Sequence, residues 1–365
     1  MTAPLLLHVF PSFAVGGAQV RFAALANRFG ARWRHAVVAL DGDTACATRL
    51  VDDVSFLPPP FAAGAGPVRR LVDIVGMLRG LRPALLVTSN WGSMDWAVAN
   101  LVARRPHLHT EDGFGPEERS QQLSRRVWAR RLALRGSRVV LPSATLEAVA
   151  LRQWRLPACN LHRIANGIDL RRFSPLGQVA ALDVPGEGPL IGTAAALRPE
   201  KNIGRLVRAV AALRDAGTPA RLAIVGDGPE RGRLEALVSQ LSLAGCTRFL
   251  GQVDDPAAAY RAFDIFTLSS DTEQMPFSIL EAMASGLAVA ATDVGDVAKM
   301  LPPENRPYVV PCDDAALAAA LGGLLGDPAL RARIGAANLA CARRDFDQEV
   351  MFQAHAKLID QSIGA

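Results

Sequence analysis

The chain has 365 residues, which is too long for one ordinary core and suits two α/β domains. Half of its residues are hydrophobic and 21% are charged, so the composition excludes an intrinsically disordered protein. The net charge of +5 at pH 7 is modest and suits acidic substrates or anionic lipid. Because no motif of interleaved basic and aromatic residues is present, we expect no nucleic-acid partner.

The five cysteines are isolated in sequence, with no Cys-x-x-Cys pair and an odd total. This pattern predicts buried thiols in a reducing compartment, and neither a disulfide framework nor a zinc site. The first ten residues lack the basic leader of a signal peptide, and the longest nearly apolar stretch, 315–326, is too short to span a bilayer. We therefore expect a cytoplasmic protein.

Short apolar runs alternate with longer amphipathic ones, the pattern of βα units around parallel sheets. The strands predicted in the first half are 5–10, 35–40, 84–88, 108–110, 139–141 and 162–164. The helices predicted between them include 18–29, 67–81 and 94–104. Together they predict a doubly wound domain over residues 1–172.

A segment rich in proline and glycine, 173–189, then predicts a linker. A second series of βα units follows and predicts another doubly wound domain over 190–347. Its predicted strands are 190–196, 222–225, 247–250, 265–268, 288–290 and 308–310. Its predicted helices include 203–215, 230–243 and 278–284, and the chain ends in helices near 315–325, 328–339 and 348–363.

Two acids eight positions apart, Glu273 and Glu281, mark the most informative stretch of the chain. Glu273 lies in a loop interrupted by proline, and Glu281 lies one turn into a helix predicted to begin near residue 277. The loop and the helix start direct both carboxylates toward one crevice, where backbone N–H groups can bind an anion. A ligand with several hydroxyls and a phosphate, such as a nucleotide-sugar, suits this arrangement. The alternative is a solvated loop beside a helix surface charge.

The sequence around these acids closely resembles the signature of the retaining GT-B glycosyltransferases of family 4. The resemblance lies in residues 270–295, where Glu-x7-Glu is followed by Ala-Met-Ala-Ser-Gly and then by Val-Ala-Ala-Thr-Asp-Val-Gly. It implies two Rossmann-like domains that face each other across a cleft. The first would bind the acceptor and the second the donor, and the C-terminal helix, about 348–365, would pack back on the first domain.

The same resemblance implies roles for the two acids. Glu281 would hold the ribose hydroxyls of the donor, and Glu273 would hold its sugar. The residues whose backbone amides would face the diphosphate are Phe277, Ser278 and Ile279. Gln274 stands where the family most often has glycine, which leaves the donor sugar open.

Two further loops of the second domain follow predicted strands at the edge where open α/β sheets bind ligands. Arg198 and Lys201 are cations that can neutralise a diphosphate, and the resembled family uses this motif for the leaving diphosphate. Solvated charges at a helix start are the alternative. Gly226 and Gly228 form a tight turn before a helix, and the family has a matching turn near the nucleotide base.

Two clusters in the first domain are candidate acceptor-side elements. Gly16 and Gly17 resemble the family's Gly-Gly loop near the reacting phosphate, and they are not a dinucleotide fingerprint. His109, Glu111 and Asp112 end a strand where many family members carry a histidine near the transferred sugar. Any of these three is a candidate. We favour Asp112, which stands directly before Gly-Phe, the place where many family members have this histidine. A carboxylate there could orient or deprotonate an acceptor hydroxyl.

Asn90 and Trp91 follow the third predicted strand and are candidates to bind a sugar acceptor, with partly buried packing as the alternative. From residue 119 to residue 138 the chain has seven arginines and no acid. The helix expected over Arg125–Arg131 carries a basic face with a tryptophan, which predicts either peripheral contact with an anionic membrane or a solvated face. Residues 166–169 match the family's interdomain stretch, and we interpret them as structural, with a donor contact as the alternative.

These features predict a retaining glycosyltransferase that needs no cofactor and no metal. It would move a sugar from a nucleoside diphosphate to a hydroxyl of a glycan or glycolipid. Two Asp-x-Asp sequences, at 41–43 and 345–347, lie outside the donor-side loops and are interpreted as chance. The alternatives are a GT-B epimerase or phosphorylase, and an inactive GT-B domain that binds or scaffolds.

Overall fold

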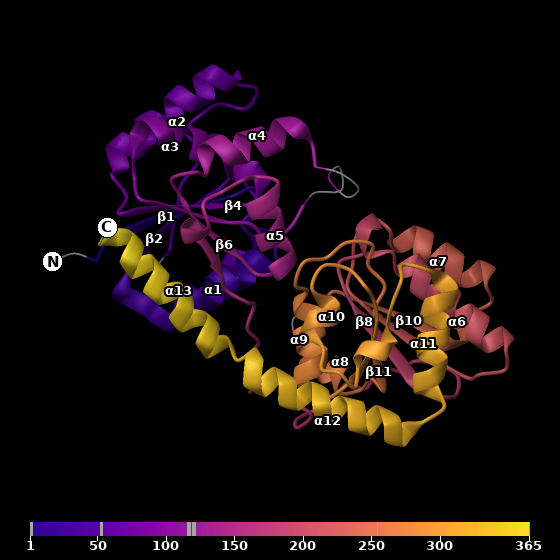
Figure 1. Cartoon of the computed structure of the whole chain (residues 1–365). Coiled ribbons are helices and arrows are strands. Elements are labelled where there is room, and N and C mark those ends of the chain that lie inside the picture. The colour runs from indigo at the N-terminus through magenta and orange to yellow at the C-terminus, as the bar shows by residue number, and fades with distance from the viewer. Residues whose placement is uncertain (1–2, 52–53, 115–117, 119–121, 254, 365) are drawn as a thin grey trace. The chain divides into compact units, whose positions relative to one another are not determined.

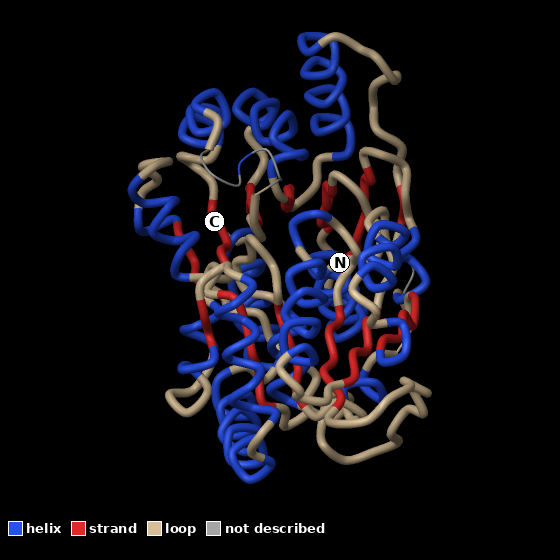
Figure 2. The backbone as a smooth tube through the Cα atoms, turned by 90° about the vertical axis from the view of Figure 1, so that its right-hand side faces the viewer, coloured by secondary structure: helices blue, strands red, loops and turns tan. Residues whose placement is uncertain are grey.

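The structure is a computed structural model, and it describes residues 3–51, 54–114, 118, 122–253 and 255–364. The chain forms two compact units: Met1–Ala165 with Met351–Ala365, and Asn166–Val350. Each unit contains one parallel β-sheet (Figures 1 and 2). We call them the first and the second unit.

The sheet of the first unit has seven parallel strands in the order β3-β2-β1-β4-β5-β6-β7. They are β1 (Leu5–Phe10), β2 (Arg34–Ala39), β3 (Ser55–Phe56), β4 (Leu85–Ser89), β5 (His107–Thr110), β6 (Arg138–Leu141) and β7 (Leu161–Arg163). The strand order reverses between β1 and β4. In sheets of this kind ligands bind at the carboxyl ends of the strands beside such a reversal.

Helices cover both faces of this sheet. They are α1 (Gly17–Phe29), α2 (Pro67–Leu81), α3 (Met94–Ala103), α4 (Ser124–Ala133), α5 (Ala144–Arg152) and the C-terminal α13 (Gln348–Ile363). Leu6 of β1 packs with Leu25 of α1 and Phe352 of α13, whereas its neighbour Leu7 packs with Leu78 of α2 on the opposite face. Because both faces are buried, the strands are apolar at nearly every position, as in other parallel sheets.

The sheet of the second unit has six parallel strands in the order β10-β9-β8-β11-β12-β13. They are β8 (Leu190–Ala194), β9 (Arg221–Val225), β10 (Thr247–Gly251), β11 (Ile265–Leu268), β12 (Ala288–Thr292) and β13 (Val309–Val310). The order reverses between β8 and β11, so a second ligand edge is expected there. The helices are α6 (Ile203–Asp215), α7 (Arg231–Gln240), α8 (Ala257–Tyr260), α9 (Phe277–Ala284), α10 (Val297–Met300), α11 (Asp314–Leu325) and α12 (Pro328–Asp345).

The two doubly wound sheets predicted from the sequence are confirmed. The bounds of β1, β11, α2, α6 and α13 agree with the prediction, and most other elements differ at their ends by one to three residues. β3 was not expected, because it has two residues, both exposed, and therefore no hydrophobic pattern. α5 was also missed, although Ser143 is a recognisable N-cap that accepts from the backbone N–H of Leu146 at 3.1 Å.

The chain passes between the units twice, near residues 165 and 350. Just inside the second unit these two segments are tied together. The Ile168 N–H donates to the Phe346 oxygen at 2.8 Å, and the Gln348 N–H donates to the Ile168 oxygen at 3.1 Å. A Cβ on Gly167 would lie 2.5 Å from the Gln348 Cα, so this crossing requires glycine.

Candidate active site

Lys201 and Glu273, which come from different loops of the second unit, form an ion pair. Lys201 lies after β8 and Glu273 lies after β11. The Lys201 Nζ donates to Glu273 Oε1 at 2.5 Å, and the Ser270 hydroxyl donates to the same oxygen at 2.8 Å. Both side chains of the pair are only partly exposed. The fold therefore brings one predicted cation and one predicted acid together at the sheet edge.

The loop that carries Glu273 is shaped by Gly295 in the turn after β12. Gly295 has a φ of 58°, and a Cβ there would lie 2.3 Å from the Glu273 carbonyl oxygen and 2.7 Å from that of Gln274. The next residue, Asp296, donates its N–H to the Gln274 oxygen at 2.9 Å. Gln274 is not among the described residues with positive φ, so a side chain is tolerated there without strain.

A buried ion pair fixes the other end of this loop. Arg205 of α6 donates to Asp271 at 2.8 Å, and neither side chain is more than 7% exposed. Asn202, at a φ of 40°, donates to the same carboxylate and caps α6 by accepting from the Arg205 N–H. None of these three residues was predicted from the sequence, although the N-cap position of Asn202 is a recognisable signal.

Arg198 lies apart from this pairing. Its side chain is exposed and lines a polar cavity of about 200 Å³ between the start of α6 and α7, together with Arg208 and Arg233. Among the residues that the structure describes, no acid pairs with Arg198. The structure thus leaves one predicted cation available to an anion while Lys201 is engaged.

Gly226 and Gly228 have φ values of 124° and 158° and press against the loop after β8. A Cβ on Gly226 would lie 1.9 Å from the Ala195 oxygen, and a Cβ on Gly228 would lie 2.6 Å from the Leu197 oxygen. The turn therefore requires glycine for contact between two loops. That contact positions the segment leading to Arg198.

Glu281, in the second turn of α9, accepts a hydrogen bond from the Tyr260 hydroxyl at 2.6 Å. Tyr260 is fully buried, and its pKa is raised well above the usual value of 10, first by burial and then by the charge of Glu281. The tyrosine therefore remains a donor at physiological pH. This partner was missed because it lies on a different helix, α8.

The start of α9 has no side-chain cap. Pro276 occupies the N-cap position without a side-chain hydrogen bond, and Phe277, Ser278 and Ile279 form the first turn. The Ile279 N–H reaches the Pro276 oxygen at 3.3 Å. The loop before the helix is held by Asn166, whose side-chain amide donates to the Met275 oxygen at 2.9 Å. A helix start of this kind can bind an anion through its backbone N–H groups.

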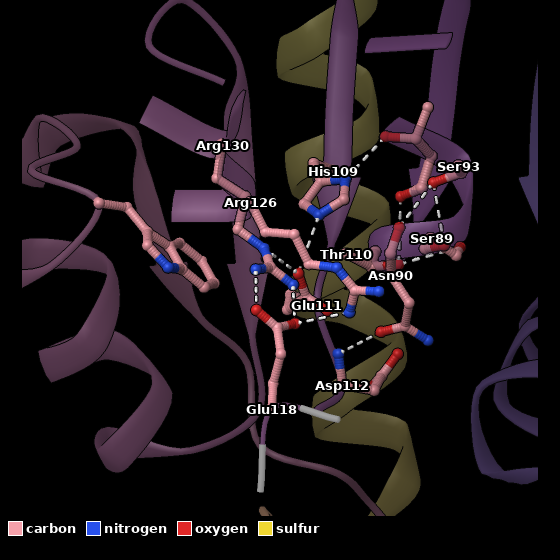
Figure 3. Close-up of polar contacts among 12 residues, drawn as sticks. Ser89, Asn90, Ser93, His109, Thr110, Glu111, Asp112, Glu118, Arg126 and Arg130 are labelled. Atoms are coloured by element: carbon pink, nitrogen blue, oxygen red, sulfur yellow. Dashed lines mark hydrogen bonds and ion pairs between the residues drawn. The ribbon is translucent and has the colours of Figure 1, made fainter. Parts of the chain in front are cut away.

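In the first unit, His109 and Glu111 lie inside the protein at the end of β5 (Figure 3). The Thr88 hydroxyl is 2.8 Å from His109 Nδ1, and Arg130 donates to Glu111 at 3.0 Å. The His109 Nε2 is 3.6 Å from the Glu111 carboxylate. Neither side chain has exposed surface, so neither is placed to touch an acceptor in this conformation.

Asp112 is the member of this cluster that reaches the surface, and it pairs with Arg21 of α1. Two hydrogen bonds of 2.6 and 2.9 Å join the guanidinium to the carboxylate. The Asp112 N–H also donates to the side-chain oxygen of Asn90 at 2.7 Å (Figure 3). His355 of α13 lies beside the pair, and its pKa is lowered to about 3, first by burial and then by the Arg21 charge, against the opposite effect of Asp112. Neither Arg21 nor His355 was predicted from the sequence, because both come from helices far from β5 in the chain.

Asn90 and Trp91 are occupied by other parts of the protein. Asn90 has a φ of 58° with a ψ of 178°, a conformation that L residues rarely adopt. The guanidinium carbons of Arg126 and Arg130 lie 4.8 and 5.1 Å from the centre of the Trp91 ring. These contacts favour packing as the main role of Trp91.

The basic stretch from 125 to 131 does not form one face. Arg126 and Arg130 are buried and paired with Glu118 (Figure 3). Trp128 and Leu132 on the same helix are exposed, and the Arg131 guanidinium lies 4.6 Å from the centre of the Trp128 ring. The exposed part of α4 is therefore both apolar and cationic, whereas two of the predicted basic residues are internal.

Gly16 and Gly17 begin α1. Gly16 is the N-cap in an extended conformation, and no side chain caps the helix. The Gln19 side chain donates to the Ser12 oxygen at 2.7 Å and closes the preceding loop. Farther along α1, Arg21 borders a small cavity of about 50 Å³ between α1, α13 and the sheet. This cavity is lined mainly by apolar side chains, including Phe22.

Within the described residues, no three side chains of His, Cys, Asp or Glu come together as a possible metal site. Among the helices that the structure describes, none is long and apolar enough to cross a membrane.

Comparison with known proteins gives two family matches. The model described as Glycosyltransferase Family 4 matches residues 15–172, and the model described as Glycosyl transferases group 1 matches residues 188–327. A GDP-mannose-dependent alpha-mannosyltransferase of Mycolicibacterium smegmatis is 32% identical over 268 residues, 70% of this chain and 68% of that protein. A protein of the same name from Mycobacterium tuberculosis is 32% identical over 189 residues, 51% of this chain and 47% of that protein. The chain thus spans about half the length of this second relative.

Two solved structures resemble nearly the whole chain. HepE of Anabaena, crystallised with UDP and glucose, has a TM-score of 0.81 at 20% identity, covering 98% of this chain and 100% of that one. The sucrose-phosphate synthase of Thermosynechococcus elongatus has a TM-score of 0.81 at 23% identity, covering 98% of each chain. The fold is therefore that of the GT-B glycosyltransferases. The chain belongs to glycosyltransferase family 4.

Proposed function

We propose that the protein is a retaining, metal-independent glycosyltransferase. It moves a sugar from a nucleoside diphosphate to a hydroxyl of a glycan or lipid-linked acceptor, in the synthesis of bacterial cell-surface polysaccharide or glycolipid. The observation that carries the proposal is the pairing of Lys201 with Glu273 in the unit that also holds Glu281 and the uncapped start of α9. The family membership supports it, and two named relatives use GDP-mannose.

The donor-side chemistry follows from this pairing. Without donor, Lys201 and Glu273 neutralise each other. A diphosphate competes for Lys201 and draws on Arg198 and the N–H groups of α9, which frees the Glu273 carboxylate to accept from sugar hydroxyls. When the bond from the anomeric carbon to the diphosphate oxygen breaks, these donors stabilise the charge that develops on the departing diphosphate.

The acceptor hydroxyl is assigned to Asp112 and not to His109 or Glu111, since those two side chains are fully buried. Within the described part of the chain, each oxygen of Asp112 accepts one hydrogen bond, from Arg21, which leaves it a second lone pair. That lone pair accepts from the acceptor hydroxyl and orients its oxygen toward the anomeric carbon. The new bond between the acceptor oxygen and the anomeric carbon forms on the face from which the diphosphate leaves, and the acceptor proton passes to the departing diphosphate oxygen. The sugar therefore keeps its anomeric configuration.

The donor site is tested by thermal unfolding of the wild type and of Glu281→Ala with GDP, UDP and ADP, each with EDTA. A nucleotide at a hundred times its dissociation constant adds about 2.7 kcal/mol to stability. We expect one nucleotide to raise the wild-type midpoint by several degrees and to lose this effect in the variant. No shift with any nucleotide in folded protein would contradict a donor site.

Transfer is tested next with the sugar nucleotides of the base that binds, GDP-mannose first, against glycan and lipid-linked acceptors. The anomeric configuration of the product, read by NMR, tests retention. Turnover that requires free phosphate would instead show phosphorolysis, and turnover abolished by EDTA would contradict metal independence.

We also propose peripheral contact with an anionic membrane through the exposed part of α4. Trp128 and Leu132 supply apolar surface, and Arg125 and Arg131 supply positive charge beside it. Sedimentation with phosphatidylglycerol vesicles should exceed that with phosphatidylcholine vesicles and fall in Trp128→Ser. Leu176→Ser, at an exposed residue of the second unit, is the control. Equal sedimentation of wild type and Trp128→Ser would contradict the proposal.

A further inference from the structure

Tyr260, the last residue of α8, is held in a rigid aromatic cluster. Its ring is fully buried, with ring centres of Phe173, Phe263 and Phe266 at 5.8, 5.6 and 5.3 Å. Its hydroxyl is the polar end of this cluster and donates to Glu281 Oε2 at 2.6 Å. The Tyr260 oxygen is also 3.4 Å from the Ser278 carbonyl oxygen, in the first turn of α9.

This geometry lets a rigid donor orient a flexible carboxylate. Glutamate has several rotatable bonds and loses rotamer freedom when it binds a ligand. A hydrogen bond between a hydroxyl and a carboxylate is strong, so Tyr260 restricts Glu281 before any ligand arrives. The Tyr260 pKa is raised well above its usual value by burial and by Glu281, which keeps the proton on the phenol.

We propose that Tyr260 is a positioning residue that holds the Glu281 carboxylate in place for the ribose hydroxyls of the donor nucleotide. This inference rests on the proposed function. Tyr260 acts through Glu281, because its own side chain has no exposed surface with which to touch a ligand. Glu281, in contrast, is partly exposed.

The experiment removes one hydroxyl from the protein and one from the ligand, separately and together, and compares the resulting dissociation constants. Calorimetry measures the dissociation constants of GDP, UDP and their 2′-deoxy forms with wild type and Tyr260→Phe, which keeps the aromatic ring. We expect Tyr260→Phe to weaken the ribonucleotide that binds by about tenfold, as for loss of a hydrogen bond to a charged group. The 2′-deoxynucleotide should be weakened much less, so the preference for ribose shrinks.

Kinetics supply a second measurement on the same variant. The KM for the sugar nucleotide should rise, while kcat and the acceptor KM remain near their wild-type values. Tyr308→Phe, which changes the other tyrosine of the chain, is the matched control and should leave all of these constants unchanged. Urea unfolding verifies that both variants are folded.

Equal weakening of the ribonucleotide and the 2′-deoxynucleotide would overturn the proposal, because it would indicate a general structural role for Tyr260. Unchanged dissociation constants in Tyr260→Phe would overturn it as well. Failure of the proposed function has a different signature: no nucleotide would bind the wild type at all, and the inference would fall with it.

Discussion

Arg21 of α1 donates to both carboxylate oxygens of Asp112 at the end of β5, at 2.6 and 2.9 Å, across 91 positions of sequence. The pair is mostly buried, and His355 from α13 lies beside it. Three distant segments of the chain therefore meet at the carboxylate to which we assign the acceptor hydroxyl. Any change in one of them is expected to affect the others.

Removing either Arg21 or the charge of Asp112 should destabilise the protein, because each change leaves one buried charge without its partner. Arg21→Ala leaves the Asp112 charge without its main partner, and we expect a loss of about 2 kcal/mol or more in the free energy of unfolding. Asp112→Asn keeps the shape, but it leaves the buried Arg21 guanidinium without its counter-charge and replaces one acceptor oxygen by an NH2 donor. It should therefore also lose about 2 kcal/mol or more of stability, and the folded variant should lose most transfer activity. An Asp112→Asn variant with full activity would contradict the role given to this carboxylate.

Lys201→Ala should slow transfer without unfolding the protein. The lysine is partly exposed, and its loss removes a positive charge that we place at the developing charge of the diphosphate. We expect kcat to fall by about 100-fold, the lower end of the range for losing one such donor. Lys357→Ala, at an exposed residue of α13, is the matched control. Comparable kcat values in the two variants would exclude the assigned role.

Gly295→Ala should disturb the loop that carries Glu273. The added Cβ would lie 2.3 Å from the Glu273 carbonyl oxygen, so the loop must move, and the nucleotide-dependent shift in melting temperature should shrink. Gly217→Ala is the control, since Gly217 also has a positive φ of 80° but has nothing within 4 Å of the added Cβ. That control should lose about 1 to 2 kcal/mol from backbone strain alone and keep the nucleotide shift. Equal nucleotide shifts in both variants would argue against the loop's role.

Stability should fall as the pH drops below about 6.5. His355 and His107 each have a pKa lowered to about 3 in the folded protein, chiefly by burial. The unfolded chain binds these protons near pH 6.5, so the stability due to the neutral rings is fully present above that pH and is lost as the pH falls toward 3. Each histidine accounts for about 1.4 kcal/mol per pH unit within that window.

Urea unfolding at pH 7.5 and at pH 5.0 checks this dependence. His355→Gln should reduce the difference between the two pH values by about 2 kcal/mol relative to wild type. If the difference in unfolding free energy between the two pH values were unchanged, His355 would be protonated at pH 5.0 in the folded protein as well as in the unfolded chain.

Much of the fold was predictable from local patterns. The strand 5–10 and the helix 203–215 have the expected bounds, because an apolar run between turn residues and an amphipathic period are local properties. β3 and the end of α12 could not be predicted from such local patterns. β3 has two exposed residues and depends on pairing with β2, and α12 continues to Asp345, six residues beyond the predicted end.

The site was partly predictable for a similar reason. Glu273, Lys201 and Asp112 were chosen as candidates because each follows a predicted strand, and parallel strands place such residues at one edge of their sheet. In the sequence, only its position directly before Gly-Phe distinguished Asp112 from Glu111. The structure separates the two acids by their partners: Glu111 forms an ion pair with Arg130 inside the protein, whereas Asp112 forms an ion pair with Arg21 near the surface.

The sequence by itself determined the alternation of strands and helices, the two doubly wound sheets and the family signature around Glu273 and Glu281, since these depend on residues close together in the chain. Only the tertiary structure decided which charges are paired: Lys201 with Glu273, Asp112 with Arg21, and Glu281 with the Tyr260 hydroxyl. The physical reason is that a side chain's hydrogen-bond partners and burial depend on elements that pack together from distant parts of the chain. No local pattern records those contacts.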